Sequence, residues 1–480
     1  MAIRQDEEES GQEAAGQPFL QDESKWTHNS EERRPWMVYL SSLVAVCGSY
    51  EFGTCAGYSS PTQSAIINDL HLSLAEFSLF GSILTFGAMI GAITSGPIGD
   101  LLGRKGAMRV ATGACVAGWL TIYFAQGVVA LDVGRFATGY GMGVFSYVVP
   151  VFIAEIAPKN LRGALTTLNQ FMICTAVSIS FIIGNVLSWR TLALTALVPC
   201  VILTFGLFFI PESPRWLAKE RRQKEFEMAL RKLRGEDVDV SQEAAEIQDF
   251  VTTLEQLPKP KVTDLFQRMY LRSVIIGVGL MVCQQFGGIN SICFYVANIF
   301  ESAGFSVFVG TISYAIIQVV VTGIGGLLMD KAGRKPLLLV NFSSNLTIKE
   351  NNNNTNNLLN SFIFHVFCFF EVLFLCLINL FEIQVYIGSF SIGMGPVPWV
   401  VMSEIFPINI KGLAGSMATL TNWFGAWACS YTFNFLMAWS SYGTFLIYAV
   451  VNAMAIGFVV LIVPETKGKS LEQIQAAING

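Results

Sequence analysis

The sequence predicts an all-α integral membrane protein with twelve transmembrane helices, arranged as two six-helix halves. Hydrophobic residues make up 52% of its 480 residues and charged residues only 14%, which is too little polar surface for a water-soluble globule. Apolar runs recur along the chain, each about 20 residues long, which is the length that a helix needs to cross a lipid bilayer. Three motifs of the first half also return in the second half, in the same order.

Polar or charged residues separate the apolar runs. We expect transmembrane helices at residues 36–58, 74–98, 107–126, 128–154, 165–187, 192–210, 273–300, 307–328, 361–381, 385–402, 413–439 and 445–463. Residues 1–34 are polar and lack the pattern of a signal peptide, so we expect a disordered cytosolic tail there. The remaining chain divides into a first half at 35–217, a cytosolic linker with helical runs at 218–270, a second half at 271–464 and a cytosolic tail at 465–480.

Lys and Arg are distributed unevenly between the expected helices. If the amino terminus is cytosolic, the loops on the far side of the membrane hold only Arg190. The loops on the cytosolic side then hold the linker and these basic residues: Arg33, Arg34, Arg104, Lys105, Arg109, Lys159, Arg162, Lys331, Arg334, Lys335 and Lys411. Because basic loops favour the cytosolic side, the asymmetry predicts that both termini are cytosolic.

Three pairs of motifs follow corresponding helices of the two halves. D-x-x-G-R-K follows the second expected helix at 100–105 and the eighth at 330–335. E-I-A-P follows the fourth at 155–158, and E-I-F-P follows the tenth at 404–407. P-E-S-P-R follows the sixth at 211–215, and P-E-T-K follows the twelfth at 464–467. The shared order indicates that one six-helix unit occurs twice in parallel.

Further motifs accompany these repeats: Gly134-Arg135 with Gly139, PESPRW at 211–216, QQFGGIN at 284–290, GPVPW at 395–399 and PETKG at 464–468. The ordered set resembles the sugar porters of the major facilitator superfamily, over nearly the whole chain except about 341–384. Segments GYSSPTQ at 57–63 and VVMSEIFP at 400–407 most resemble the plant branch named for early response to dehydration. The resemblance implies the major facilitator fold and transport of a monosaccharide, such as a glucose-like hexose, by alternating access.

Amide side chains in the middle of the expected helices are candidates for sugar contacts. A sugar hydroxyl both donates and accepts hydrogen bonds, and Gln and Asn do the same without the cost of burying a charge. The candidates are Gln170, Gln284, Gln285, Asn290, Gln318 and Asn422. Gly287-Gly288 predicts a local helix break that lets Gln284 and Asn290 point the same way. By resemblance all six line the sugar pocket, with Trp399 and Trp423 stacked on the sugar ring; alternatively, some of these amides bond neighbouring helices.

Charged residues of the repeated motifs form a second candidate group. They are Asp100, Arg104, Glu155, Arg162, Glu212, Arg215, Asp330, Arg334, Glu404, Lys411 and Glu465. They resemble the ion-pair network that holds the halves together when the sugar site faces outward, and remaking such pairs supplies the differential contacts of a two-state switch. Lys411 stands where the family usually has Arg, which forfeits a bidentate bond. The alternative is a solvated set of basic loops.

The first helix leaves energy coupling open. Proton-driven relatives carry an Asp where this chain has Cys55, facing the arginine that corresponds to Arg135. Glu51 lies four residues earlier on the same helical face, and a carboxylate inside a membrane helix is a functional candidate. Glu51 either titrates against Arg135 in a proton-coupled symporter or is a structural hydrogen-bond partner in a facilitator. Ser391, where animal facilitators have a Glu, shows that the site differs from theirs too. We favour facilitated transport.

The sequence indicates no other chemistry. The ten cysteines form no C-x-x-C pair and are expected to pack in apolar helices, and the three histidines form no metal-like cluster. We expect neither an enzyme nor a cofactor, metal or nucleic-acid partner. The expected partners are the lipid bilayer, a monosaccharide and, for a symporter, protons. A non-transporting sugar sensor is the alternative from another class, which the short tail after Pro464 disfavours. The resemblance favours the vacuolar membrane over the plasma membrane.

Residues 341–384 do not fit the family pattern. They include ten Asn and eight Phe but no Gly, Ala, Pro or Arg. A polar, low-complexity tract precedes the ninth apolar run, and that run lacks the small residues that let membrane helices approach closely. We interpret the stretch as translated intron or a mispredicted exon, with the ninth helix badly formed or displaced. The alternative is a genuine divergent helix behind a long loop.

Overall fold

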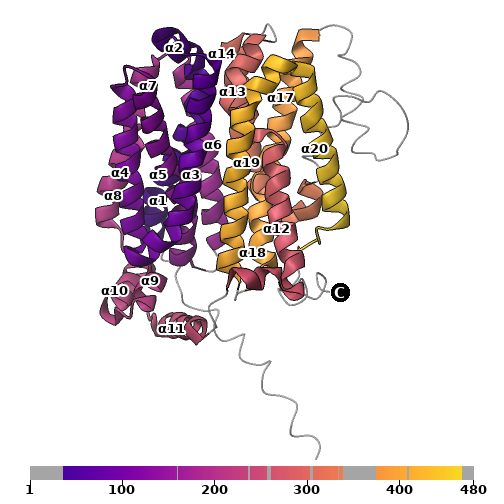
Figure 1. The fold of residues 1–480 in the computed structure, drawn as a ribbon. Helices are drawn as coiled ribbons and strands as arrows, with labels where there is room; N and C mark the ends of the chain where they lie inside the picture. Colours follow the sequence, from indigo (N-terminus) through magenta and orange to yellow (C-terminus); the bar gives the residue numbers. More distant parts are fainter. Residues whose placement is uncertain are drawn as a thin grey trace, which may run out of the picture.

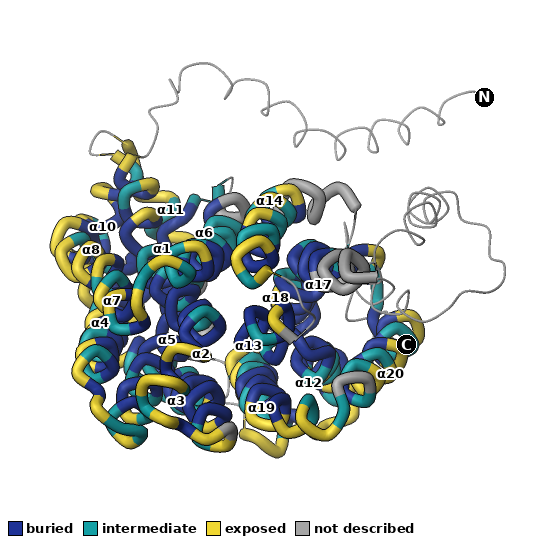
Figure 2. The backbone as a smooth tube through the Cα atoms, turned by 90° about the horizontal axis from the view of Figure 1, so that it is seen from above, coloured by how far each residue is buried: buried dark blue, intermediate teal, exposed yellow. Residues whose placement is uncertain are grey.

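The computed structural model describes residues 36–158, 161–235, 238–256, 261–302, 306–332, 334–338, 375–407 and 410–466, and every element within these ranges is helical. Two groups of long helices stand side by side, one from each half of the chain (Figure 1). The view from above shows the same division, with α1 to α8 in one group and α12 to α20 in the other (Figure 2).

The first helix group comes from the first half of the chain. It consists of α1 (Trp36–Gly57), α2 (Ser59–Leu70), α3 (Leu74–Leu101), α4 (Gly103–Tyr123), α5 (Val128–Ile156), α6 (Arg162–Gly184), α7 (Trp189–Thr195) and α8 (Leu197–Phe209). The short helix α2 lies at one end of the bundle, at the top of Figure 1. We call this end the α2 face.

A helical linker lies at the opposite end, which we call the linker face (Figure 1). It consists of α9 (Pro214–Lys219), α10 (Gln223–Arg234), α11 (Ser241–Gln256) and the 3-10 helix η1 (Val262–Phe266). The hydroxyl of Ser213 accepts the backbone N–H of Trp216, and Pro214 occupies the first turn, so α9 starts with a standard N-cap. Gly235, with φ 115°, ends α10.

The second helix group comes from the second half of the chain. It consists of α12 (Arg268–Phe286), α13 (Ile289–Ser302), α14 (Val307–Ala332), α17 (Leu375–Ile392), α18 (Val397–Ile405), α19 (Lys411–Trp439) and α20 (Ser441–Leu461). The expected break in the seventh transmembrane helix is confirmed, because α12 ends at Phe286 and α13 begins at Ile289. Gly288 between them has a φ of 97°, which a side chain would disfavour.

Eight described segments are long and apolar enough to span a membrane by length and composition alone. They are Ala75–Leu101, Val128–Ile156, Thr167–Gly184, Trp189–Phe209, Arg268–Glu301, Val307–Gly325, Gln384–Ile405 and Gly443–Leu461. Helices α1, α4 and α19 run between the same two faces (Figure 1). The chain is therefore a multi-pass membrane protein, and its architecture is consistent with twelve membrane-spanning helices.

Small residues bring α3 and α5 into close contact. An added Cβ on Gly139 would collide with the carbonyl oxygen of Leu84, and one on Gly143 would collide with that of Ala88. Without side chains at these positions, the two backbones can approach each other directly. The glycines at 139 and 143 thus serve helix packing.

Several expected boundaries differ from the structure. The expected helix 192–210 is divided into α7 and α8, and the expected helix 385–402 is interrupted between α17 and α18. Helix α2 forms where a loop was expected; Pro61 fits its first turn, and Ile66 is buried. We expected one helix to end at 381 and the next to begin at 385. This boundary is wrong, because α17 continues unbroken to Ile392, and the first proline after it is Pro396. Residues 341–374, most of the unusual stretch, lie outside the described part of the chain.

The two groups bond to each other toward the α2 face. Asn434 Nδ2 on α19 donates to Ser78 Oγ, near the start of α3, at 2.9 Å. The backbone N–H of Ala297 on α13 donates to Ser60 Oγ on α2, at 3.0 Å. Since α2 lies at this end of the bundle, these contacts bring the groups together there (Figure 1).

Candidate functional site

Amide side chains of the second group converge where α12 breaks. Gln285 Nε2 donates to Asn422 Oδ1 at 2.5 Å and lies 3.4 Å from Gln284 Oε1. Asn290 Nδ2 donates to Gln285 Oε1. The turn at Gly287-Gly288 lets α13 present Asn290 to Gln285, which a continuous helix would not do. We call Gln284, Gln285, Asn290 and Asn422 the amide cluster; Gln285 is its centre.

The Gln284 side chain also bonds the backbone at a second helix break. Its Nε2 donates to the carbonyl of Met394 and lies 3.4 Å from that of Gly395. These two residues lie between α17 and α18, where backbone carbonyls lose their helical partners. In this conformation Gln284 therefore bonds a neighbouring helix, which is the alternative role that the sequence leaves open.

The remaining two amides lie on α6 and α14. Gln170 Nε2 lies 3.5 Å from Cys174 Sγ, within α6. Thr322 Oγ1 donates to the backbone carbonyl of Gln318 at 2.6 Å, within α14. Because α6 and α14 pack against each other across the two groups, Gln170 and Gln318 lie along a boundary between the halves.

The two candidate tryptophans differ in burial. Trp423 is only 6% exposed, and its ring centroid lies 5.9 Å from that of Phe52 on α1 of the first group. Trp423 therefore lies between the two groups. Trp399 keeps 42% of its surface exposed, so its stacking on a sugar ring stays a prediction.

Several polar atoms near this boundary are buried without a hydrogen-bond partner. Among them are Gln318 Oε1, an acceptor, and Trp423 Nε1, a donor. Burying such atoms costs free energy unless a partner is supplied. A ligand rich in hydroxyl groups supplies both kinds of partner.

Glu51 and Arg135 lie in the same buried region but have different partners. Glu51 Oε1 accepts the indole N–H of Trp119 at 2.5 Å. Arg135 Nη1 donates to the Cys55 carbonyl at 3.0 Å, and Arg135 Nη2 donates to Ser59 Oγ. The arginine is therefore held by neutral groups, and its pairing with Glu51 stays a prediction.

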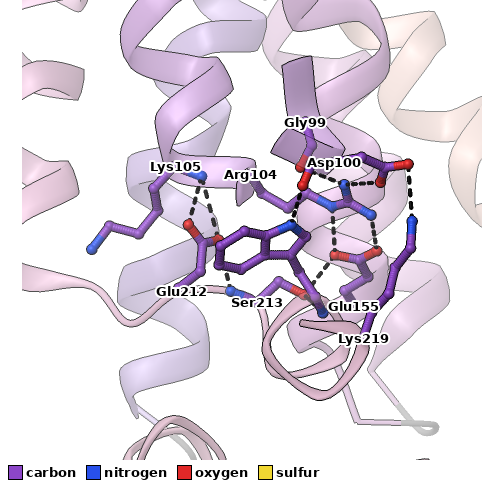
Figure 3. Close-up of polar contacts among 9 residues, drawn as sticks. Gly99, Asp100, Arg104, Lys105, Glu155, Glu212, Ser213 and Lys219 are labelled. Carbon is purple, nitrogen blue, oxygen red and sulfur yellow. Dashed lines mark hydrogen bonds and ion pairs between the residues drawn. The ribbon is translucent and has the colours of Figure 1, made fainter. Parts of the chain in front are cut away.

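The charged motif residues of the first group meet at the linker face (Figure 3). Arg104 donates to both oxygens of Glu155, at 2.9 and 3.1 Å, and to Asp100 at 3.2 Å. Lys219 on α9 pairs with the other oxygen of Asp100 at 2.9 Å. The bidentate geometry makes Arg104–Glu155 the strong member of this set.

Glu212 caps the start of α4. Its carboxylate accepts the backbone N–H groups of Lys105 and Ser213, the latter at 2.8 Å. It lies so close to Gly103, where φ is 79°, that an added Cβ would approach Glu212 Oε2 to 2.6 Å. Burial raises the pKa of Glu212, whereas these backbone N–H groups oppose the rise.

The second group repeats this arrangement. Arg334 Nη2 donates to Glu404 at 3.2 Å, as Arg104 does to Glu155. Glu465 accepts the backbone N–H groups of Arg334 and Lys335 at 3.1 and 3.0 Å, as Glu212 does in the first group. Equivalent motifs thus make equivalent bonds within each half, which supports the internal repeat.

The other predicted members of this network are Lys411, Arg215, Arg162 and Asp330. Lys411 is exposed and donates to the Ser403 carbonyl at 2.8 Å. Arg215 is half-buried on α9. The side chains of Arg162 and Asp330 lie outside the described part of the structure. Bonds from this network across the two halves stay a prediction.

Sequence reasoning missed several partners of these residues. Ser213 Oγ donates to Glu155 at 2.6 Å, and Trp119 binds Glu51. The signal for Ser213 is present in the motif PESPRW, since it is the N-cap residue of α9. Nothing in the sequence pairs Trp119 with Glu51, because they are on different helices.

Known proteins resemble this chain over nearly its whole length. The family model described as "Sugar (and other) transporter" matches residues 17–478. The chain is 66% identical to sugar transporter ERD6-like 7 of Arabidopsis thaliana over 455 residues, which cover 94% of this chain and 96% of that protein. It is 56% identical to sugar transporter ERD6-like 16 of the same plant over 472 residues, which cover 97% and 95%.

Solved structures show the same fold. The inward open conformation of the xylose transporter XylE from E. coli has a TM-score of 0.74 at 26% identity, covering 92% of this chain and 99% of that chain. The proton:xylose symporter XylE bound to 6-bromo-6-deoxy-D-glucose has a TM-score of 0.72 at 25% identity, with the same coverage. These similarities, over nearly the full length of both partners, place the chain in the sugar transporter family, as a sugar porter of the major facilitator superfamily in its ERD6-like branch.

Proposed function

We propose that this sugar transporter carries a monosaccharide of the glucose type by alternating access, as a facilitator. The observation that carries the proposal is the amide cluster, which lies at the broken helix α12 and uses neutral donors and acceptors. Hydroxyl groups of a sugar match such amides without requiring a buried charge. The unpaired Gln318 Oε1 and Trp423 Nε1 are further contacts for the same ligand.

A counterflow experiment tests the substrate. Proteoliposomes are preloaded with unlabelled D-glucose, and the entry of labelled D-glucose is followed with an excess of competing sugars outside. We expect hexoses of the glucose type to compete and sugar alcohols, which lack the ring for Trp423, to compete weakly. Equal competition by both classes would contradict the assigned ring contact.

Facilitated transport is supported by the partners of Arg135. A proton-coupled site needs a carboxylate whose ion pair is exchanged when it takes up a proton. Here Arg135 is bonded to the Cys55 carbonyl and the Ser59 hydroxyl, and Glu51 is bonded to Trp119 and faces Cys55. The Glu51 carboxylate and the Arg135 guanidinium do not depend on each other for their hydrogen bonds, as expected in a facilitator.

The second candidate is a proton-coupled sugar symporter. It is favoured by the likeness to XylE, a proton:xylose symporter, and by the presence of Glu51 inside a membrane helix. In that mechanism Glu51 takes the role of the missing Asp at position 55. The two candidates differ in whether a proton gradient drives accumulation of sugar.

We infer that the described conformation faces the cytosol and that the linker face is the cytosolic one. The support is the bonding of the two groups toward the α2 face, the likeness to inward open XylE and the excess of Lys and Arg at the linker end. Both termini are then cytosolic. We place the protein in the vacuolar membrane, which a fluorescent fusion imaged against a vacuolar marker would test.

Removing a bond at the α2 face should favour the outward-facing state. Asn434→Ala removes the hydrogen bond to Ser78, one of those that join the groups there, so the closed end should open more often. We expect faster hydrogen exchange in peptides covering 74–80 and 430–436, measured by mass spectrometry. Asn452→Ala is the matched control, since Asn452 bonds the carbonyls of Tyr448 and Gly287, both in its own helix group. Equal exchange in both variants would contradict this account of the closed face.

A further inference from the structure

A second polar cluster lies inside the first helix group, apart from the amide cluster. It brings together Glu51 and Cys55 of α1, Cys115 of α4 and Cys200 of α8, each at most 1% exposed. Cys55 Sγ donates to Glu51 Oε1, and the Cys115 thiol lies within 4.8 Å of the same carboxylate. Sugar transport as derived above uses none of these three thiols. We call these four residues the thiol cluster.

The distances in the thiol cluster suit a metal ion. Cys55 Sγ lies 3.6 Å from Glu51 Oε1, and the ligand atoms of Glu51, Cys55 and Cys115 all lie within 4.8 Å of one another. A tetrahedral ion with metal–sulfur bonds of about 2.3 Å has ligand atoms about 3.8 Å apart. Small side-chain shifts therefore bring the three atoms to bonding positions.

The Glu51 carboxylate has an unused oxygen at this point. Glu51 Oε2 is fully buried and has no hydrogen-bond partner, although Oε1 is held by Trp119. The nearby guanidinium of Arg135 is directed to Cys55 O and Ser59 Oγ instead. A carboxylate buried without a cation is costly, and a bound cation would remove that cost.

The surroundings orient these side chains as in a built metal site. The indole N–H of Trp119 fixes one oxygen of Glu51, as hydrogen bonds of outer groups fix metal ligands. The thiols of Cys55 and Cys115 both donate to the Thr138 carbonyl, at 3.9 and 3.8 Å, so both lie against one backbone position, and these two bonds would be given up when the thiols bind an ion. Gly141 leaves room for the Cys115 thiol, since an added Cβ there would collide with it.

We propose that the thiol cluster binds one Zn²⁺ ion through Glu51, Cys55 and Cys115, whose ligand atoms lie within 4.8 Å of one another. Cys200 lies outside that group of atoms, and a shift of its side chain toward the ion would complete the four-coordinate, sulfur-rich set that zinc prefers. The thiols release their protons as they bind the ion. Because the ligands come from α1, α4 and α8 of one half, the ion acts as a structural cross-link within that half and is not transported cargo.

The metal content of the full-length protein tests this proposal. The chain is purified in detergent, without chelators, from cells grown with added zinc, and metal is measured by mass spectrometry. We expect one zinc per chain in the wild type and in Cys283→Ala, a thiol of the second group outside the cluster. Cys115→Ser and Cys55→Ala should each lose most of the zinc. Added Cd²⁺ should give the full ultraviolet absorption of metal–thiolate bonds in wild type and in Cys283→Ala, but not in Cys115→Ser or Cys55→Ala.

Folding is checked in each variant by size-exclusion chromatography. Cys115→Ser keeps the size of the side chain, so it still tests the site if Cys55→Ala fails to fold. The zinc content of the wild type tests the proposal without any variant. Folded wild type with far less than one zinc per chain, and without thiolate absorption after Cd²⁺ is added, would overturn the proposal. Full zinc content in a folded Cys115→Ser protein would overturn the ligand assignment.

Discussion

Arg104→Ala should be the most destabilising single change at the linker face. Arg104 and Glu155 are only 9% and 13% exposed and share two hydrogen bonds, so the variant leaves a carboxylate buried without its cation. Removing one partner of a buried ion pair costs roughly 3–5 kcal/mol of folding free energy. The loss is measured as a lower midpoint when the detergent-purified protein is heated and the folded fraction is followed by size-exclusion chromatography.

Lys219→Ala is the matched control for that experiment. Lys219 also pairs with a carboxylate of the same network, Asp100, but the two side chains are 49% and 52% exposed. Exposed ion pairs contribute only about 0–1 kcal/mol, because water and salt screen them. We expect a small shift in the midpoint for Lys219→Ala. Equal losses in the two variants would mean that burial of the Arg104–Glu155 pair does not decide its contribution.

Gln285→Ala should cause the largest loss of sugar affinity. Gln285 is bonded to Gln284, Asn290 and Asn422, so its removal takes away its own contacts to the sugar and the bonds that position its neighbours. Each hydrogen bond lost costs roughly 0.5–1.5 kcal/mol, and about 1.4 kcal/mol corresponds to a tenfold change in affinity. We expect the dissociation constant for the sugar to rise at least about tenfold, as measured by calorimetry on the purified protein.

The control for this variant is Gln248→Ala. Gln248 lies on the linker helix α11, at the linker face and outside the amide cluster. Its substitution by Ala removes the same number of side-chain atoms. Sugar affinity should stay at the wild-type value. A folded Gln285→Ala protein that binds sugar as tightly as wild type would remove Gln285 from the site.

Much of the fold follows from the sequence because membrane helices leave strong local signals. Apolar length predicts each long helix, and Gly287-Gly288 predicts the break between α12 and α13. The exact ends depend on contacts that a sequence does not display. Helix α17 runs past the expected boundary near 381–385, since only Pro396 and its neighbours interrupt the helix. Helix α2 is too short and polar to give a membrane signal.

The candidate site was predictable only in part. The chemistry of sugar hydroxyls singles out the amides, and the structure brings four of them together. The partners of Gln284 are backbone carbonyls of Met394 and Gly395, more than 100 residues away, which residue type alone does not reveal. The thiol cluster, too, is formed by residues that are distant in the sequence. Cys115 and Cys200 carry no motif, and only the packing of α4 and α8 brings them to Glu51.

Sugar uptake with and without a proton gradient tests the central claim most directly. Purified protein is reconstituted into proteoliposomes, and labelled D-glucose inside is followed until it stops changing. The account predicts saturable uptake that ends when the inside concentration equals the outside one, with or without the gradient. Accumulation above the outside concentration in the presence of the gradient, abolished by a protonophore, would contradict facilitated transport, and uptake no faster than in empty liposomes would contradict transport itself.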